Sequence, residues 1–365
     1  MKRFQAYDPK EYLDWQPDPE VTRSYRRRVD DDPTLRAECD ALGLEGYRRI
    51  YQALVRTRLY DVTLKRWVRT GVLTKAWLGT GEEATTVGAV HALAGADVVG
   101  PMIRNQGACF EKGIPLADCF KVYLATGDTI TRGRDLHIGD LQHNVVAPIS
   151  HVGDLVPVLA GFALAFHVRR ESRVALTWCG EGATRTGAFH EGLSFAADLG
   201  LPLVVVVQNN GVALGTRCGD TLARALDGLP GGYGVTGRVC DGNHVLEVYS
   251  TIREARALCV RGQGPVVVQA RTFRMGGHAT HDEAEARELF DAEVFRHWGA
   301  RCPVGCFEEF LASEPVMGPD PRGRLAQWEA EVNDEVEAAA AAALAARETS
   351  PVDPGAMAND VFASA

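Results

Sequence analysis

One carboxylate and one carboxamide stand where they could bind a metal ion. Glu181 lies between two glycines just after the apolar run 173–178, and Asn210 follows the apolar run 203–207. Both runs are predicted to be strands, and open α/β sheets bind ligands beyond the carboxyl ends of their strands. Carboxylate and amide oxygens, with a backbone carbonyl beyond Asn210, suit Mg²⁺ or Ca²⁺ and leave positions for phosphate oxygens. The spacing therefore indicates a metal-bound diphosphate.

The residues after Glu181 are expected to begin a helix. The backbone amides of Gly182 and Ala183 would then face outward at its start, a place that favours phosphate. A purely structural alternative also exists, in which Gly180 to Ala183 cap a strand-to-helix turn and residues 209–211 form an Asn-Asn-Gly turn. The matched order of strand, helix and strand favours the ligand-binding interpretation.

The same stretch resembles a known family. Glu181 between its two glycines, with Asn209 and Asn210 farther along, resembles the fingerprint of thiamine-diphosphate enzymes. With segments 180–184 and 189–197, the sequence is similar to the alpha subunit of the decarboxylating component of 2-oxo acid dehydrogenase complexes. The resemblance covers about residues 45 to 300. Glutamate rather than aspartate at position 181 resembles the branched-chain 2-oxo acid members of the family.

The resemblance implies thiamine diphosphate and Mg²⁺ as cofactors. It implies metal ligation by Glu181, by Asn210 and by the backbone carbonyl of Val212. His278 would be the catalytic residue, beside the diphosphate and the reacting centre, in a loop ordered by Arg274 and Asp282. The implied cofactor contacts are Arg104, Ser150, Gly180, Glu181, Gly182, Ala183, Asn210, Val212 and His278. Without the resemblance, Arg104 and His278 would be interpreted as surface residues beside turns.

Several residues depart from the family pattern. Ile103 stands where an aromatic residue usually precedes the arginine, and Val212 also replaces an aromatic residue. His151 and Asp154 replace small and hydroxyl residues around a monovalent-cation site that some members carry. Ala279 occupies the place of the serine that animal mitochondrial members phosphorylate, so we do not expect control by that phosphorylation.

The elements that must position these residues alternate along the chain. Expected strands are 97–100, 173–178, 203–207, 235–239 and 265–271. Expected helices are 44–70, one opened by the acidic pair 82–83, 155–168, 189–199, 245–261 and 328–348. Such alternation predicts an α/β fold with a doubly wound, mostly parallel sheet flanked by helices. The polar, glycine-punctuated segment 127–144 is expected to be a loop, with His137 and His143 exposed to solvent.

Length and composition set the outer bounds. With 365 residues, 46% of them hydrophobic, the chain can bury a large core. We expect an N-terminal arm (1–40), a diphosphate-binding domain (41–300) and a C-terminal helical extension with a tail (301–365). The net charge of −9 argues against nucleic acid as a partner. The longest apolar stretch, 155–168, is too short to span a bilayer, and the start lacks a secretory pattern, so the cytoplasm is the expected location.

The cysteines are expected to be reduced thiols. They number nine and are irregularly spaced, which does not suggest a disulfide framework. His297, Cys302 and Cys306 together offer only three zinc ligands, so ordinary packing or surface placement is the preferred interpretation.

The resemblance implies the function as well. The chain would be the alpha subunit of an enzyme that oxidatively decarboxylates a 2-oxo acid and passes the acyl group to lipoyl on the acyltransferase component. A branched-chain 2-oxo acid is favoured, with pyruvate and acetoin as alternatives. In the family, the glutamate that activates thiamine comes from a separate beta subunit, which implies an α₂β₂ assembly. The local candidates, Glu82 and Glu83, are expected to serve the helix they open.

Two alternatives to this function stay open. One is half of a transketolase-type thiamine enzyme without a lipoyl partner. The other is a catalytically silent scaffold subunit. A dehydrogenase of the Rossmann type is disfavoured, because no Gly-x-Gly-x-x-Gly motif follows an early strand.

Overall fold

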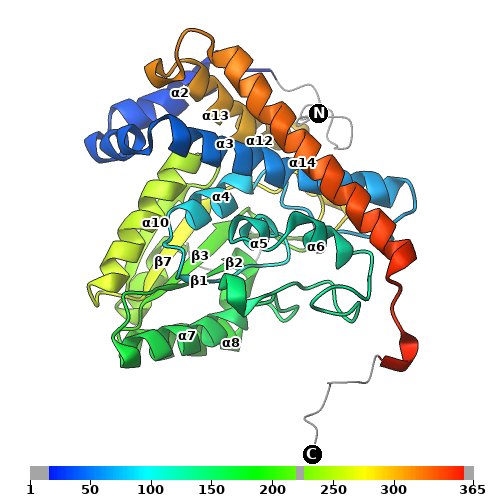
Figure 1. Cartoon of the computed structure of the whole chain (residues 1–365). Coiled ribbons are helices and arrows are strands. Elements are labelled where there is room, and N and C mark those ends of the chain that lie inside the picture. The colour runs from blue at the N-terminus through cyan, green and yellow to red at the C-terminus, as the bar shows by residue number, and fades with distance from the viewer. Residues whose placement is uncertain (1–15, 219–225, 357–365) are drawn as a thin grey trace, which may run out of the picture.

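A five-stranded parallel sheet forms the centre of the protein in a computed structural model that describes residues 16–218 and 226–356 (Figure 1). The strand order is β1-β2-β3-β7-β6, and every neighbouring pair runs parallel. The strands are β1 (Val98–Gly100), β2 (Ala175–Gly180), β3 (Leu203–Asn209), β6 (Thr236–Asp241) and β7 (Val266–Arg271). Beyond β3 the strand order reverses, because β7 lies next to β3 and β6 lies at the edge of the sheet, as in a doubly wound sheet. This confirms the predicted fold class.

Alternate residues of the central strand pack against opposite layers of helices. Val204 and Val206 of β3 join the larger apolar core, whereas Val205 and Val207 join the smaller one. Side chains alternate between the two faces of a strand, so a strand covered on both sides must be apolar throughout. This explains why the run 203–207 shows no polar interruption.

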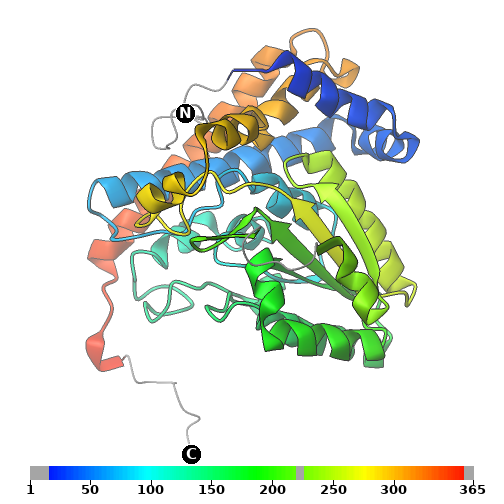
Figure 2. The ribbon, with the colours of Figure 1, turned by 180° about the vertical axis from the view of Figure 1, so that it is seen from behind.

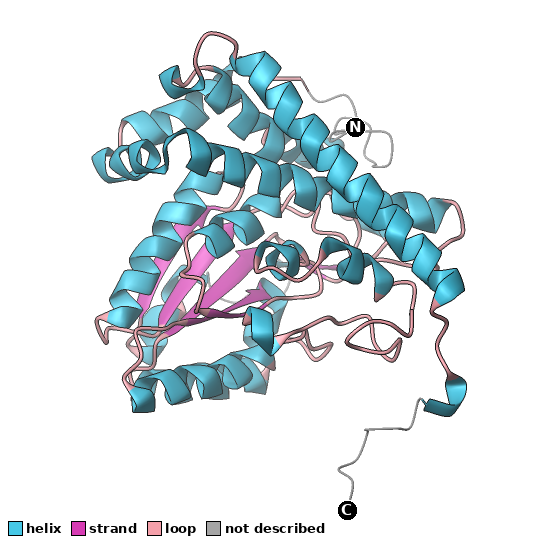
Figure 3. Cartoon of the chain, in the orientation of Figure 1, coloured by secondary structure: helices cyan, strands magenta, loops and turns pink. Residues whose placement is uncertain are grey.

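The two layers of helices differ in size (Figures 1 and 3). On one side lie α7 (Leu155–Arg169) and α8 (Gly187–Asp198), which pack on each other and contribute to the smaller core. Opposite them lie α3 (Pro33–Arg69), α4 (Glu83–His91) and α10 (Val245–Val260), with α14 (Pro321–Thr349) laid across α3. Figure 2 shows the same layers from behind. Among the described residues, the other α-helices are α2 (Pro19–Asp30), α5 (Gly107–Glu111), α6 (Leu116–Lys121), α11 (Glu283–Glu288), α12 (Ala292–Ala300) and α13 (Pro303–Ala312).

The first long helix begins earlier than its hydrophobic pattern predicted. Its N-cap is Asp32, whose carboxylate accepts hydrogen bonds from Thr34 N at 3.0 Å and Leu35 N at 3.1 Å. Pro33 occupies the first helical position, where its missing N–H has no cost. Gly43, with a φ of 57°, then interrupts the helix. The apolar periodicity that starts at Leu44 therefore marks only the part beyond this kink.

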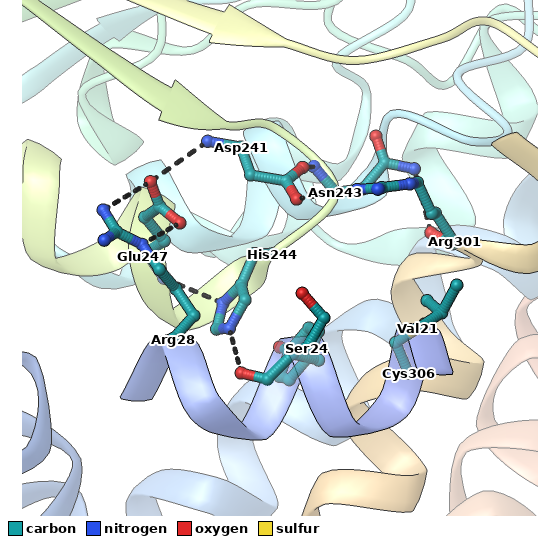
Figure 4. Close-up of a pocket in the computed structure, with 10 residues that line it drawn as sticks. Val21, Ser24, Arg28, Asp241, Asn243, His244, Glu247, Arg301 and Cys306 are labelled. Atoms are coloured by element: carbon teal, nitrogen blue, oxygen red, sulfur yellow. Dashed lines mark hydrogen bonds and ion pairs between the residues drawn. The ribbon is translucent and has the colours of Figure 1, made fainter. Parts of the chain in front are cut away.

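The described end of the predicted arm packs on α10 (Figure 4). Tyr25 of α2 stacks on His244, with ring centroids 3.5 Å apart and planes inclined by 6°. The guanidinium of Arg28 donates to both oxygens of Glu247, at 2.9 and 3.1 Å. In Figure 4, His244 and Glu247 both face α2. The domain boundaries placed near residues 40 and 300 stay a prediction.

Two expectations from composition can be compared with the fold. All nine cysteines are free, as expected. Among the described residues, no helix combines the length and the apolarity needed to cross a membrane.

Candidate active site

The turn after β2 carries the acidic residue singled out in the sequence. Residues Glu181–Arg185 form a 3₁₀ turn (η2) between β2 and the helix expected over 189–199, so the amides of Gly182 and Ala183 belong to this turn and not to the start of an α-helix. The α-helix begins later, at Gly187, where Thr186 caps it by accepting a hydrogen bond from Phe189 N at 3.3 Å. The short turn brings Gly182 against the segment after β3. A Cβ atom on Gly182 would lie 2.5 Å from the Cβ of Ala213, so the glycine permits this close approach.

Glu181 is buried and bound on both carboxylate oxygens. The residue is only 1% exposed to solvent. Oε1 accepts from the Cys218 thiol at 3.2 Å, and Oε2 accepts from the backbone N–H of Asn210 at 3.4 Å. Burial raises the pKa of Glu181 above its usual 4.5, and the charge of Glu82 acts in the same direction. No sequence signal marked Cys218, because its contact with Glu181 depends on the fold of the intervening turn.

Asn210 is oriented by a hydrogen bond at each end of its amide. Its Nδ2 donates to Oε1 of Glu82 at 3.0 Å, and its Oδ1 accepts from Val212 N at 3.2 Å. Val212 begins the short strand β4 (Val212–Ala213), which pairs with β5 (Thr216–Arg217). The preceding Asn209 instead accepts at its backbone oxygen from Thr272 N at 3.0 Å. The structure thus separates the two asparagines into one that faces the carboxylates and one that joins β3 to the loop after β7.

The acidic pair before α4 does not behave as expected from its position at a helix start. Glu82 makes no capping hydrogen bond with its side chain. Its carboxylate instead lies beside Asn210, with Oε2 3.9 Å from Nε of Arg104. Glu83 forms a fully buried ion pair with Arg58 and accepts from Gly81 N at 3.0 Å. Glu82 therefore does not cap the helix through its side chain but reaches the site, which the sequence did not predict.

Arg104 and His278 form a direct pair. Nη1 of Arg104 donates to the backbone oxygen of His278 at 2.6 Å, and Nη2 lies 3.0 Å from Nδ1 of the imidazole. A guanidinium can only donate, so Nδ1 must accept and the proton of the neutral ring resides on Nε2. Burial lowers the pKa of His278 from 6.5 to about 4, and Arg104 and Arg274 add to the effect. His278 is consequently uncharged at neutral pH.

The loop that carries His278 is held by the two residues expected to order it. Asp282 accepts from His278 N at 3.1 Å and from Ala279 N at 2.7 Å. Arg274, which is 3% exposed, donates to the backbone oxygens of Gly276 at 3.2 Å and Leu214 at 3.4 Å. Burial lowers the pKa of Arg274 to about 10. Arg274 therefore remains a cation at neutral pH.

A second set of contacts ties this loop to the turn before α4. Met275 N donates to Thr80 O at 3.1 Å, and Thr280 N donates to Ala76 O at 2.9 Å. Gly81, with a φ of 96°, passes so close to the loop that a Cβ would lie 2.5 Å from the oxygen of Phe273. The segments 76–81 and 273–282, distant in sequence, therefore form one unit beside the site.

A cavity of about 250 Å³ opens among these elements. Of the sequence-predicted residues, Arg104, Ser150, Gly180, Ala183 and His278 line it. Much of the remaining wall is apolar and consists of Trp77, Met102, Ile103, Ile149, Val152, Leu155, Val156 and Trp178.

The other four predicted residues, Glu181, Gly182, Asn210 and Val212, lie beside the cavity rather than on its wall. They connect to it in two ways. Glu181 and Gly182 lie in the chain between the wall residues Gly180 and Ala183. Asn210 reaches the wall through Glu82 and Arg104.

One histidine of the polar loop also reaches the cavity. His137 lines the wall with a side chain only 15% exposed, which contradicts the expectation that it faces solvent. Its Nδ1 lies 2.8 Å from Oδ1 of Asp135, and its Nε2 lies 3.5 Å from Oγ of Ser150. His143 lies outside the wall, paired with Asp140 at 2.7 Å and 33% exposed. The polar loop sequence alone offered no means of telling the two histidines apart.

The cluster considered for zinc serves packing instead. Cys302 caps α13 by accepting from Gly305 N at 3.4 Å, and the Cys306 thiol donates to Ala300 O at 3.6 Å. Within the described residues, no group of three or more His, Cys, Asp or Glu side chains is arranged to hold a metal ion. Cys302 and Cys306 are buried, whereas His297 is exposed at the surface.

The donor atoms around Glu181 nonetheless suit a hard cation with a diphosphate. They comprise one carboxylate, one amide oxygen and one backbone carbonyl, all of the oxygen type that Mg²⁺ prefers. Oε2 of Glu82 is buried beside them and has no hydrogen-bond partner, with Nε of Arg104 3.9 Å away. On the cavity side, Arg104 and the amides of η2 offer positive charge and donors to an anion. The residues therefore fit thiamine diphosphate with Mg²⁺.

The fold and site define an α/β protein with a ligand cavity at the carboxyl ends of parallel strands, lined by a cation and a neutral histidine. The chain belongs to the dehydrogenase E1 component family, which it matches over residues 51–352. This confirms the resemblance seen in the sequence.

Three relatives illustrate the family. The chain is 29% identical over 283 residues to the alpha 1 subunit of mitochondrial 2-oxoisovalerate dehydrogenase from Arabidopsis thaliana, which covers 76% of this chain and 59% of the relative. It is 31% identical to the 2-oxoisovalerate dehydrogenase alpha subunit of Bacillus subtilis, over 67% of this chain and 76% of the relative. It is 30% identical to the alpha subunit of acetoin:2,6-dichlorophenolindophenol oxidoreductase from Cupriavidus necator, over 79% of this chain and 85% of the relative. The chain therefore spans less than two thirds of the length of the Arabidopsis relative.

Proposed function

We propose that this chain is the alpha subunit of a thiamine-diphosphate-dependent 2-oxo acid dehydrogenase and binds the Mg²⁺–diphosphate end of the cofactor. One observation carries the proposal. Buried Glu181 and Asn210 meet beyond β2 and β3, beside a cavity lined by the paired Arg104 and His278. The names of the relatives support it, since they are alpha subunits of enzymes acting on 2-oxoisovalerate or acetoin.

Each residue has a task in this proposal. Glu181, the Oδ1 atom of Asn210 and the carbonyl of Val212 would hold Mg²⁺. Arg104, which reaches the cavity from the loop after β1, would neutralise diphosphate charge.

The remaining groups would act at the reacting end. The neutral imidazole of His278 would present its Nε2 proton as a donor without adding positive charge. When bound, thiamine diphosphate supplies the electron sink for decarboxylation of the 2-oxo acid. The apolar wall would exclude water, which strengthens these polar interactions.

The apolar wall also favours the substrate class. Ile103, Ile149 and Val152 offer aliphatic surface to a substrate side chain. A branched-chain 2-oxo acid suits such a wall and agrees with the names of two of the three relatives above. Pyruvate and acetoin are the alternatives, the latter because of the Cupriavidus necator relative.

A beta subunit would complete the site. Thiamine activation needs a carboxylate at the aminopyrimidine ring, which acts in proton transfer. Among the described residues, the cavity wall contains no carboxylate. Glu82 is engaged with Asn210, and Glu83 with Arg58. We therefore propose an α₂β₂ assembly. It would pass the acyl group formed from the 2-oxo acid to the lipoyl acyltransferase component. The cytoplasmic location stays a prediction.

The proposal is tested by assaying the chain assembled with its beta subunit. Decarboxylation would be followed with an artificial electron acceptor in the presence of Mg²⁺ and thiamine diphosphate. We expect the highest kcat/KM for 2-oxoisovalerate among 2-oxoisovalerate, pyruvate and acetoin. Absence of turnover with all three, from an assembly that binds the cofactor, would favour the silent-scaffold alternative.

A further inference from the structure

Glu82 is a buried acid that the proposed ligand set leaves out. The residue is 1% exposed, and burying a carboxylate is costly unless charges and hydrogen bonds compensate it. The negative charge of its neighbour Glu83 is compensated by an ion pair with Arg58 at the other side of the turn. Glu82 has weaker support, namely one hydrogen bond from Asn210 and Arg104 at 3.9 Å. Its Oε2 has no hydrogen-bond partner.

The hydrogen bond from Asn210 fixes which end of that amide points where. An ionised carboxylate only accepts, so Glu82 selects the NH₂ group of Asn210 and turns the amide oxygen away from itself. That oxygen then faces Val212 N, on the side of the proposed metal ligands. A flipped amide would set two oxygens against each other at Glu82 and would present an NH₂ group to a cation. Glu82 thus distinguishes the two orientations of a side chain that is nearly symmetric in shape.

The same carboxylate also acts on the arginine of the cavity. Its Oε2, which has no hydrogen-bond partner, lies 3.9 Å from Nε of Arg104. The negative charge of Glu82 favours the cationic form of both Arg104 and Arg274. Arg104 in turn holds His278 through two contacts. Glu82 therefore lies between Asn210 on the metal side and the arginine and histidine on the diphosphate side.

We propose that Glu82 is a positioning residue that presets Asn210 for Mg²⁺ and Arg104 for diphosphate before the cofactor binds. This rests on the proposed function. Residues behind the ligands of a metal commonly act in this way, and their loss typically weakens metal affinity about 10- to 100-fold. Glu82 touches no substrate in this proposal, which separates it from the activating glutamate expected from the beta subunit.

Positioning and simple electrostatics predict opposite results for Asn210→Asp. Adding a negative charge beside a metal ion would, by Coulomb interaction alone, strengthen the binding of that cation. If Glu82 positions Asn210, the same change weakens binding, because two carboxylates then oppose each other and neither can donate the hydrogen bond that sets the orientation. Glu82→Gln also weakens binding, because a glutamine amide can either accept from or donate to Asn210 and no longer selects one orientation. The measurement is the apparent affinity for Mn²⁺ at saturating thiamine diphosphate, followed by electron paramagnetic resonance on the assembled protein.

A swapped pair provides the sharpest test. Combining Glu82→Gln with Asn210→Asp exchanges donor and acceptor, keeps the total charge and leaves a carboxylate oxygen free for the metal. We expect each single variant to lose about tenfold or more in Mn²⁺ affinity, and the double variant to return to within about threefold of wild type. Glu308→Gln changes a buried carboxylate that accepts from Tyr51 outside the site and should leave the affinity unchanged.

The outcomes separate this inference from the proposed function. If the wild-type assembly does not bind Mn²⁺ with thiamine diphosphate, both fall. If wild type binds and Glu82→Gln binds within twofold or more tightly, only the role of Glu82 is overturned. Losses in the two single variants that simply add in the double variant would overturn it as well. Circular dichroism of each variant establishes that it is folded. If Glu82→Gln is not folded, Glu82→Asp replaces it, and a Mn²⁺ affinity within twofold of wild type in that shortened variant would overturn the role of Glu82.

Discussion

His278 owes its neutral form first to burial and then to its neighbours. Arg104 contributes a donor to Nδ1 and a positive charge, and both disfavour a protonated ring. Because the folded pKa of about 4 lies below the usual 6.5, the unfolded chain binds the proton more readily between these values. His278 therefore lowers stability as the pH falls through this window, and contributes nothing of this kind above it.

The first residue-scale prediction concerns this pair. Arg104→Met removes the positive charge and the donor, so the pKa of His278 should rise toward its usual value. Proton NMR of the histidine ring, assigned with His278→Asn, measures it across a pH titration. Arg322→Met changes an arginine on α14 and serves as the control, with no change expected at His278. An unaltered His278 titration in Arg104→Met would contradict the pairing.

The second residue-scale prediction concerns Glu181. Glu181→Ala removes the only carboxylate of the proposed metal ligands and should weaken Mg²⁺-dependent binding of thiamine diphosphate by more than tenfold, about 1.4 kcal/mol. Calorimetric titration of the folded variant measures this. Glu308→Ala, which removes a buried carboxylate elsewhere, is expected to bind as wild type does. An unchanged affinity in Glu181→Ala would remove this residue from the metal site.

At the scale of elements, the turn before α4 and the loop after β7 act as one unit. Gly81 permits their close approach, both by its φ of 96° and by its missing side chain. Gly71 offers a matched comparison, since its φ is 74° and a Cβ there would meet nothing within 4 Å. A left-handed backbone costs a non-glycine residue roughly 1–2 kcal/mol, so both positions carry that penalty.

The element-scale prediction follows from this comparison. Gly71→Ala should cost only the backbone strain and leave cofactor binding intact. Gly81→Ala should cost more in unfolding free energy and should also weaken binding of thiamine diphosphate, because the added Cβ displaces the loop that carries His278. Chemical denaturation and calorimetry of the two variants provide the comparison. Equal effects in both would show that the approach at Gly81 does not hold the loop.

The elements themselves were largely predictable, whereas contacts between them were not. The apolar run 203–207 and the glycines around Glu181 indicated two buried strands and a ligand site at their ends. The positions of Glu82 and His137 could not be predicted in this way. Each depends on how a turn or loop crosses another segment far away in sequence, and neither lies in a periodic pattern. The 3₁₀ form of the turn at Glu181 could not be predicted, because a helix start and a single turn share the same local residues.

At the scale of the whole molecule, the described wall of the cavity provides binding groups for only part of the proposed cofactor. Arg104, Ser150 and the η2 turn suit a diphosphate, and the apolar residues of the wall suit an aliphatic group. Among the described residues, nothing on that wall offers the carboxylate that thiamine activation requires. In the function proposed above, this chain contributes half of a shared active site.

The most direct test is turnover by the full chain alone and then with its beta subunit. Both are assayed for oxidative decarboxylation of 2-oxoisovalerate with an artificial electron acceptor, at saturating Mg²⁺ and thiamine diphosphate. The account predicts no turnover by the chain alone and turnover on addition of the beta subunit, which is lost again in Glu181→Ala. Substantial activity from the chain alone would contradict it and would identify a self-sufficient thiamine enzyme.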